Sequence, residues 1–185
     1  DQLLLLLCYE CKILNNIIDD VVCVLNLSTG QQLTQGNVSS YRFNKTGQWL
    51  AMTIDSAGKA ANGLQLMEMK TQRIIPLDQD KVRYRSLTWT KRGDGFTVLK
   101  ASSNPKYSKP LYQILAYSKF AGGKPTKLII DPLKDRGIPD HMTISPNRTP
   151  MWTETLDGVL FGIHDAGLKS PPKSKTTAGK KKPSS

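Results

Sequence analysis

The chain has 185 residues, of which 38% are apolar and 22% charged, so it can bury a core and is not a low-complexity protein. Its net charge is +11, but six of the positive charges are lysines within residues 169–185, and the remaining +5 is spread along the chain. Nucleic-acid sites are marked by a clustered basic stripe, so the charge makes nucleic-acid binding the weakest of the functions considered below.

Residues 1–20 follow no recognisable pattern, and we treat them as an atypical N-terminal segment. The apolar run Leu3–Leu7 is much shorter than the roughly 20 residues that a membrane-spanning helix needs. Cys8 and Cys11 form a lone Cys-x-x-Cys with no second pair, and Cys23 stands alone, so ordinary thiols are favoured over a metal or redox site. Because the chain begins with Asp rather than Met, we expect a fragment of a longer protein.

From residue 21 onward, alternation of apolar and polar residues predicts a series of short strands. In chain order the expected strands are Val21–Leu27, Gln31–Thr34, Ser40–Phe43, Trp49–Ile54, Leu64–Met69, Arg73–Leu77, Ser86–Trp89, Phe96–Lys100, Leu111–Tyr117 and Thr126–Ile130. Turn residues separate them, and no segment has a helix-length apolar face with caps. The pattern therefore predicts an all-β protein.

A motif of an aromatic residue, a glycine-containing turn and a strand recurs at Phe43, Trp89 and Trp152, and its third copy reads as looser by one residue. The first two copies are 46 residues apart, which is about the length of one four-stranded propeller blade. The third follows after 63 residues, and we place the extra length in a proline-rich loop over residues 131–150. The repeats predict a partial β-propeller of about three four-stranded antiparallel blades over residues 21–166.

Residues 167–185 are rich in Lys, Pro and Ser, and we expect them to form a disordered basic tail or linker. Propellers typically have four to eight blades. We therefore expect this chain to be part of a larger propeller.

The segment Phe43–Ala51 reads Phe-Asn-Lys-Thr-Gly-Gln-Trp-Leu-Ala. It resembles the Phe-Ser-Pro-Asp-Gly-Lys-Trp-Leu-Ala element of TolB-like and prolyl oligopeptidase-type propellers, which are WD40-like in repeat length. Asn62–Thr71 is similar to a strand-and-turn element of the same blades. The order of elements over residues 21–165 most resembles the N-terminal propeller of bacterial prolyl oligopeptidase-family serine peptidases.

In that family the catalytic residues lie in a separate hydrolase domain, whose serine nucleophile stands in a Gly-x-Ser-x-Gly turn. This sequence contains no such motif, and its two histidines, His141 and His164, read as loop or surface residues. We therefore assign no catalytic, metal-binding or cofactor-binding residue, and expect no cofactor. The tryptophans Trp49, Trp89 and Trp152 read as packing residues rather than a ligand-stacking set. The acids Asp78, Asp80, Asp131, Asp135 and Asp140 read as loop acids without the spacing of a calcium site.

The resemblance implies that the propeller caps a hydrolase domain and restricts the access of peptides, in a periplasmic or secreted protein. The expected function is thus a non-catalytic propeller segment with a structural and substrate-gating role. Its expected partners are the rest of the propeller, a hydrolase domain, and a peptide or protein substrate. The alternative is a TolB-like protein-interaction propeller without enzymatic activity. Binding of nucleic acid through the lysine-rich tail is a third, weaker hypothesis.

Overall fold

The computed structural model describes residues 3–8, 11–13, 16–18, 21–120, 122 and 124–169. The tail expected beyond residue 169 lies outside these residues. The strands, in chain order, are β1 (Leu3–Cys8), β2 (Cys11–Ile13), β3 (Asn16–Ile18), β4 (Val21–Asn26), β5 (Gln32–Gln35), β6 (Val38–Phe43), β7 (Trp49–Ile54), β8 (Gly63–Glu68), β9 (Arg73–Gln79), β10 (Tyr84–Trp89), β11 (Gly95–Ser102), β12 (Leu111–Ser118), β13 (Thr126–Ile130), β14 (Met142–Ile144), β15 (Met151–Trp152), β16 (Val159–Leu160) and β17 (Ile163–Asp165).

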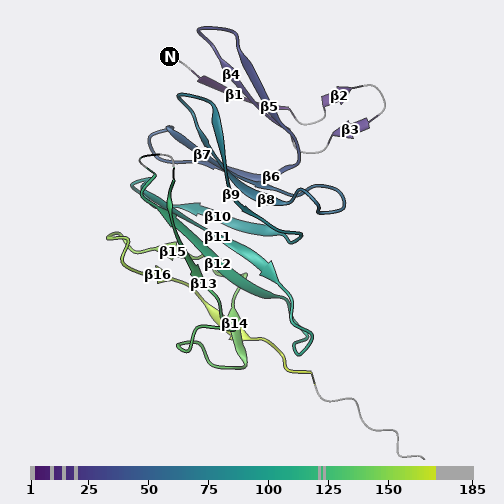
Figure 1. Cartoon of the computed structure of the whole chain (residues 1–185), viewed down its shortest axis with the longest axis vertical. Helices are drawn as coiled ribbons and strands as arrows, with labels where there is room; N and C mark the ends of the chain where they lie inside the picture. Colours follow the sequence, from purple (N-terminus) through teal and green to yellow (C-terminus); the bar gives the residue numbers. More distant parts are fainter. Residues whose placement is uncertain are drawn as a thin grey trace, which may run out of the picture.

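All strand pairs are antiparallel, and most join neighbours in the chain; β1 with β4 and β14 with β17 are the exceptions in the described residues (Figure 1). The N-terminal sheet has the order β1-β4-β5, the second sheet β6-β7-β8-β9 and the third sheet β10-β11-β12-β13. Two short pairs, β15-β16 and β14-β17, form the C-terminal hairpins. A further hairpin, β2-β3, is inserted between β1 and β4.

Three apolar clusters lie between successive sheets. Val22 and Val24 of the N-terminal sheet pack with Leu50 and Met52 of the second sheet. Ala51 lies between Leu50 and Met52 on β7, and its side chain points to the opposite face, where it joins a cluster with the third sheet. This follows from the period of two in a strand, which sends successive side chains to opposite faces. Because both faces of the second and third sheets are covered, their central strands read as continuous apolar runs.

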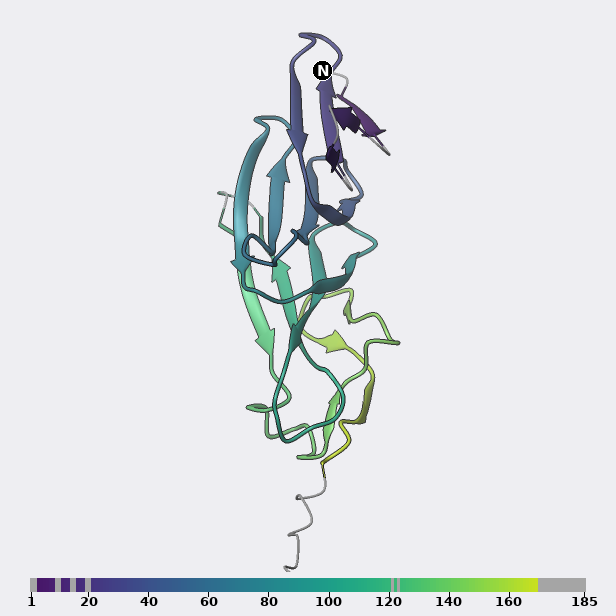
Figure 2. The same cartoon turned by 90° about the vertical axis from the view of Figure 1, so that its right-hand side faces the viewer.

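The third cluster joins the third sheet to the C-terminal hairpins. Leu99 and Ile114 contribute from β11 and β12, while Ile144, Trp152 and Val159 contribute from the hairpins. The sheets therefore follow one another along the long axis of the molecule, each leaning on the next, in both views (Figures 1 and 2). This arrangement confirms the predicted all-β, partial β-propeller. Two of the sheets in the described residues are complete four-stranded blades.

All ten strands predicted from residue 21 onward are present, with bounds that differ by a few residues at most. Several strands lie where none was expected, among them β1, β2, β3 and β14. β1 runs beside β4, from Leu3 opposite Asn26 to Cys8 opposite Val21, and so adds part of the unassigned segment 1–20 to the N-terminal sheet. β14 lies within residues 131–150, which had been read as a loop throughout. Ordered contacts also continue past residue 166, because Leu168 forms a bridge with Tyr107.

The repeated motif forms the same turn three times, and the third copy has the same length as the others. The amides of Asn44, Thr90 and Thr153 donate to the carbonyls of Trp49, Gly95 and Gly158, at 2.9, 2.8 and 2.8 Å. The fifth residue of each copy has a positive φ: Gly47 at 71°, Gly93 at 78° and Leu156 at 58°. Our reading of a one-residue difference in the third copy is therefore wrong, because a leucine occupies the left-handed position that glycine holds in the other two.

Candidate functional site

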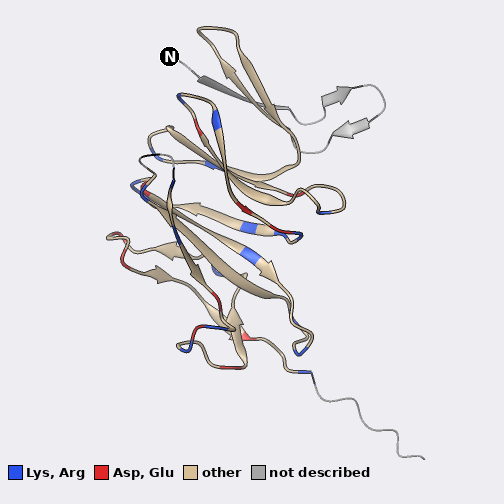
Figure 3. Ribbon diagram, in the orientation of Figure 1, with Lys and Arg blue, Asp and Glu red and all other residues tan. Residues whose placement is uncertain are grey.

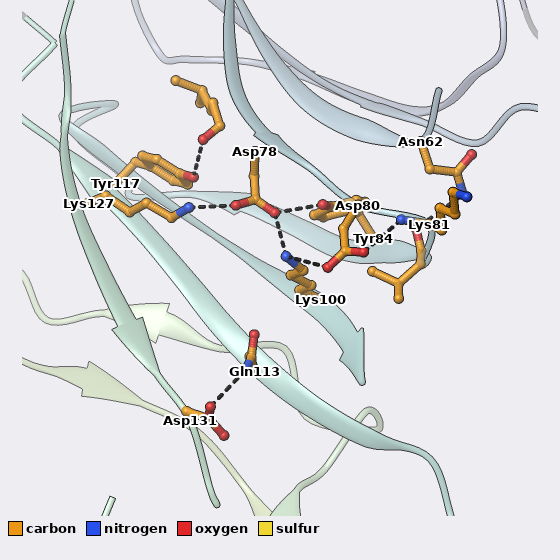
Figure 4. Close-up of polar contacts among 12 residues, drawn as sticks. Asn62, Asp78, Asp80, Lys81, Tyr84, Lys100, Gln113, Tyr117, Lys127 and Asp131 are labelled. Carbon is orange, nitrogen blue, oxygen red and sulfur yellow. Dashed lines mark hydrogen bonds and ion pairs between the residues drawn. The ribbon is translucent and has the colours of Figure 1, made fainter. Parts of the chain in front are cut away.

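The most connected polar group in the described residues lies between the second and third sheets and is centred on Asp78 of β9 (Figure 4). Two features of β9 place it there. Its edge position tolerates Pro76, which cannot donate to a sheet ladder. A bulge then leaves Leu77 as the extra residue between the pairs Gln65–Pro76 and Leu64–Asp78. Bulges change the direction in which neighbouring side chains project.

Four side chains, one from each strand of the third sheet, meet β9 here. The hydroxyl of Tyr84 on β10 donates to Asp78 Oδ2 at 2.6 Å, and Lys100 Nζ on β11 lies 2.9 Å from the same oxygen. Lys127 Nζ on β13 lies 2.6 Å from Asp78 Oδ1. The bulge residue takes part as well, because the hydroxyl of Tyr117 on β12 donates to the carbonyl of Leu77 at 3.2 Å.

Asp80 extends the group, with its Oδ2 3.0 Å from Lys100 Nζ. The side chains of Asp78 and Lys100 are only 12% and 15% exposed, so their charges interact at a lower effective dielectric than surface pairs do. We call Asp78, Asp80, Tyr84, Lys100 and Lys127 the Asp78 cluster.

Burial of Asp78 by itself would raise the pKa of its carboxyl, but the hydrogen bonds from Lys100, Lys127 and Tyr84 outweigh it and lower the pKa below the ordinary value. Burial also acts against the charged form of Lys100, yet Asp78 and Asp80 raise its pKa overall. The pKa of Tyr84 is raised, first by burial and then by its bond to Asp78. These pKa directions favour the charged forms of Asp78 and Lys100 and the neutral form of Tyr84, and the contacts among the groups join β9 to the third sheet.

The structure places the other candidates separately. His141 is exposed, and its carbonyl accepts a bond from the amide of Ala166. His164 lies on β17 opposite Thr143. Of the five acids read as loop residues, Asp78 lies within a strand and forms ion pairs, which corrects that reading for it. Over residues 21–120, 122 and 124–169, no group of three or more His, Cys, Asp or Glu side chains is placed to hold a metal ion.

The three tryptophans pack against the sheet interfaces, consistent with their interpretation as core residues. Trp89 and Phe96 rings lie 4.8 Å apart, and both approach Phe120 in the connection after β12. Their indole groups differ in one respect. The Nε1 groups of Trp89 and Trp152 donate to backbone carbonyls of neighbouring strands, whereas that of Trp49 has no hydrogen-bond partner among the described residues.

Trp49 lines an open cavity of about 760 Å³ at the end of the sheets where the repeated turns lie. We call it the turn-face cavity. It is bounded by residues 26, 44, 46–49, 68–70, 93, 94, 119, 120 and 156. A second cavity, of about 320 Å³, lies between β10 and β15 and is lined by Trp89, Met151 and Trp152 among others.

Sequence reasoning found the tryptophans but missed the Asp78 cluster. In the sequence Tyr84 stands between Arg83 and Arg85, a pattern typical of a solvated strand edge, whereas in the structure it is 5% exposed. The ion pair between Asp78 and Lys127 spans 49 residues. No local spacing could indicate such a pair, because the two residues meet only when two sheets pack.

No family model and no curated protein matches the chain. Among solved structures, it is similar to the β-propeller domain of the Trilobed protease from Pyrococcus furiosus, with 12% identity and a TM-score of 0.48 over 88% of this chain and 50% of that one. It is similar to an acylaminoacyl peptidase from Pyrococcus horikoshii, with 10% identity and a TM-score of 0.43 over 73% of this chain and 24% of that one.

A third likeness is to TolB from Acinetobacter baumannii, with 16% identity and a TM-score of 0.38 over 80% of this chain and 35% of that one. The chain thus spans half or less of the length of each of these structures. The likenesses concern the propeller fold only. In the part of the chain that the structure describes, no helix is long and apolar enough to cross a membrane.

Proposed function

We propose that this chain is a non-catalytic propeller segment of a prolyl oligopeptidase-like serine peptidase, with a structural and substrate-gating role. The proposal joins the observed stack of blades to the motif resemblance of Phe43–Ala51 and Asn62–Thr71. In this role the segment contributes blades to a larger propeller, and that propeller restricts which peptides reach a hydrolase domain.

The observation that carries the structural half is the way each sheet depends on its neighbour. The second and third sheets share an apolar cluster and the Asp78 cluster, and neither sheet has a core of its own. In repeat proteins stability comes from such interfaces, so a terminal unit requires a cover. The C-terminal hairpins expose Met151, Leu160 and Ile163 at 52%, 61% and 44%. These side chains supply an apolar surface against which a further sheet would pack.

The first experiment tests the non-catalytic half. The purified 185-residue chain is incubated with short chromogenic peptides, with and without a serine-directed inhibitor. We expect no turnover above the buffer rate. Turnover that the inhibitor abolishes would contradict the proposal.

The second experiment tests gating in the parent protein. The sequence following Ser185 is determined first, and a Gly-x-Ser-x-Gly motif followed by Asp and His is expected. Residues 21–166 are then deleted, and hydrolysis of a tripeptide is compared with that of a folded protein substrate. Loss of the propeller should raise the relative rate on the protein. Further blades followed by a stop codon would instead favour the protein-interaction propeller.

A further inference from the structure

The turn-face cavity has the size of a ligand site. Its volume of about 760 Å³ falls within the range of roughly 300 to 1,000 Å³ that is usual for such sites. Its lining crosses successive sheets: Asn26 comes from the N-terminal sheet, Trp49 from the second, Phe120 from the third, and Leu156 from the C-terminal hairpins. An elongated ligand would therefore contact more of this surface than a compact one.

One wall of the cavity is apolar and also carries an indole N–H group that can donate a hydrogen bond. The rings of Trp49 and Phe120 lie 5.8 Å apart at an angle of 42°, and Leu156 adds an aliphatic side chain. Trp49 is half-buried, and its indole N–H has no hydrogen-bond partner in the described residues. Buried tryptophan N–H groups usually find a hydrogen-bond partner, and those of Trp89 and Trp152 have one here.

The charges around the cavity favour an anion. Its two acids form ion pairs with arginines that do not line the cavity. Glu68 Oε2 lies 3.6 Å from an Arg73 Nη atom, and Asp94 Oδ2 lies 2.9 Å from Arg92 Nε. Its two lysines, Lys70 and Lys119, are exposed and form no ion pair with any residue that the structure describes. The charge available to a ligand is therefore positive.

The backbone at one of these lysines is unusual. Lys119 has a φ of 57°, in the left-handed region that non-glycine residues seldom adopt. Here Lys119 follows β12 directly and precedes Phe120, so the same connection supplies both a cation and an aromatic ring to the cavity.

We infer that the turn-face cavity binds an extended peptide that carries an apolar side chain next to a carboxylate. The apolar side chain packs against the exposed sides of the Trp49 and Phe120 rings, a peptide carbonyl accepts a hydrogen bond from Trp49 Nε1, and the carboxylate pairs with Lys119 or Lys70. The inference rests on the blade arrangement in the proposed function and does not require a hydrolase domain. The bound peptide would lie at the end of the sheets where the repeated turns are.

The test uses the indole resonances in a ¹H–¹⁵N correlation spectrum of the 185-residue chain. Three indole signals are expected, and Trp49→Phe identifies the one that belongs to Trp49. Acetyl-Asp-Leu-Asp-amide is titrated to several millimolar. We expect the Trp49 signal to shift with a Kd of about 1 mM or below, and the other two signals to move much less. Well-dispersed signals at the start show that the chain is folded.

Two peptides serve as matched controls. Acetyl-Asn-Leu-Asn-amide keeps the apolar side chain and removes the charge, and acetyl-Asp-Gly-Asp-amide does the reverse. Both should bind at least fivefold more weakly. Lys119→Gln should weaken the acidic peptide by about fivefold, which is the upper range for an exposed ion pair. Lys81→Gln, an exposed lysine outside the cavity, should leave its affinity unchanged.

Equal shifts with all three peptides, or no shift of the Trp49 signal in a well-dispersed spectrum, would overturn the inference. Binding of 4-phenylbutyrate without binding of the acidic peptide would also overturn it, because a small aryl carboxylate would then be the ligand class. These outcomes are separate from those of the deletion experiment, which tests gating through turnover in the parent protein.

Discussion

The indole Nε1 of Trp89 on β10 donates to the carbonyl of Arg42 on β6, at 2.9 Å. Each is the first strand, and an edge strand, of its four-stranded sheet. The bond joins them at the same end as the repeated turns, where the side-chain amide of Asn44 also donates to the carbonyl of Gly93, at 3.2 Å. In two of the three copies the motif aromatic, Trp89 or Trp152, thus donates to a backbone carbonyl of the preceding sheet, in addition to filling the core.

Replacing Trp89 by Phe should lower the free energy of unfolding by about 1 to 2 kcal/mol, because it leaves the Arg42 carbonyl without its donor and removes ring area. Trp49→Phe is the matched control. It removes the same atoms from an indole without a described hydrogen-bond partner, so its loss should be smaller. Urea denaturation followed by circular dichroism gives both values. Equal losses would show that the hydrogen bond contributes nothing.

Gly93→Ala should be strongly destabilising, by about 2 to 4 kcal/mol. A Cβ at this position would lie 2.6 Å from the backbone nitrogen of Lys45, and the residue has a φ of 78°. Gly47→Ala provides the comparison, because its φ is 71° and nothing lies within 4 Å of its Cβ position. Its cost should be only about 1 kcal/mol, from backbone strain alone. Thermal melts of the two variants separate the close contact from the strain.

Asp78→Asn should lower the free energy of unfolding by about 2 kcal/mol, since Lys100 and Lys127 would keep their charge without a carboxylate between them. The partial exposure of both lysines reduces the loss from that of a fully buried pair. Glu68→Gln is the control. Its pair with Arg73, whose side chain is 55% exposed, should contribute less than about 1 kcal/mol. A similar loss in the two variants would contradict the role given to the Asp78 cluster.

The contribution of Asp78 should also depend on pH. Its pKa in the folded protein is lowered, whereas in the unfolded chain it is about 3.9. Above that value both states are ionised and the full stabilisation is present. As the pH falls, the unfolded chain takes up the proton first, and the stabilisation is lost through the folded pKa. The difference between the wild type and Asp78→Asn should therefore be constant from pH 7 to 5 and shrink below about pH 4. A constant difference down to pH 3 would contradict this.

The 185-residue chain should self-associate through its open C-terminal hairpins. Leu160 on β16 is 61% exposed, and exposed apolar edge strands invite pairing with another chain. Leu160→Lys should reduce the weight-average mass in sedimentation velocity at micromolar concentrations without lowering stability. Leu133→Lys, at a loop leucine that is 47% exposed, should have no such effect. A wild-type chain that sediments as a monomer throughout would rule the prediction out.

The spread of charge along the chain could be predicted from the sequence. Basic and acidic residues are interspersed along the described sheets and turns (Figure 3), as the spread of the remaining charge had indicated. Which charges matter was beyond sequence reasoning. Asp78 and Arg73 lie on the same strand, yet Asp78 meets two lysines of the next sheet while Arg73 stays at an exposed turn. The difference comes from the bulge at Leu77 and from the packing of the sheets.

In the third copy of the motif, the conformation of a single residue, Leu156, could not be predicted from the sequence. The third copy has no glycine at its fifth position, where the backbone places Leu156 in register with Gly47 and Gly93. Glycine is the usual sign of a left-handed residue because it has no Cβ. Here the turn holds Leu156 in that conformation, so the turn is present although the sequence has no glycine to indicate it.

The sequence alone determined the ten strands from Val21 to Ile130 and the repeat that makes them blades, because these depend on alternation and turn residues a few positions apart. The tertiary structure decided which polar groups meet between the blades, where Trp49 is left with a donor, and how β1 joins the N-terminal sheet. Those contacts join residues tens of positions apart, and only the packing of one sheet on the next brings them together.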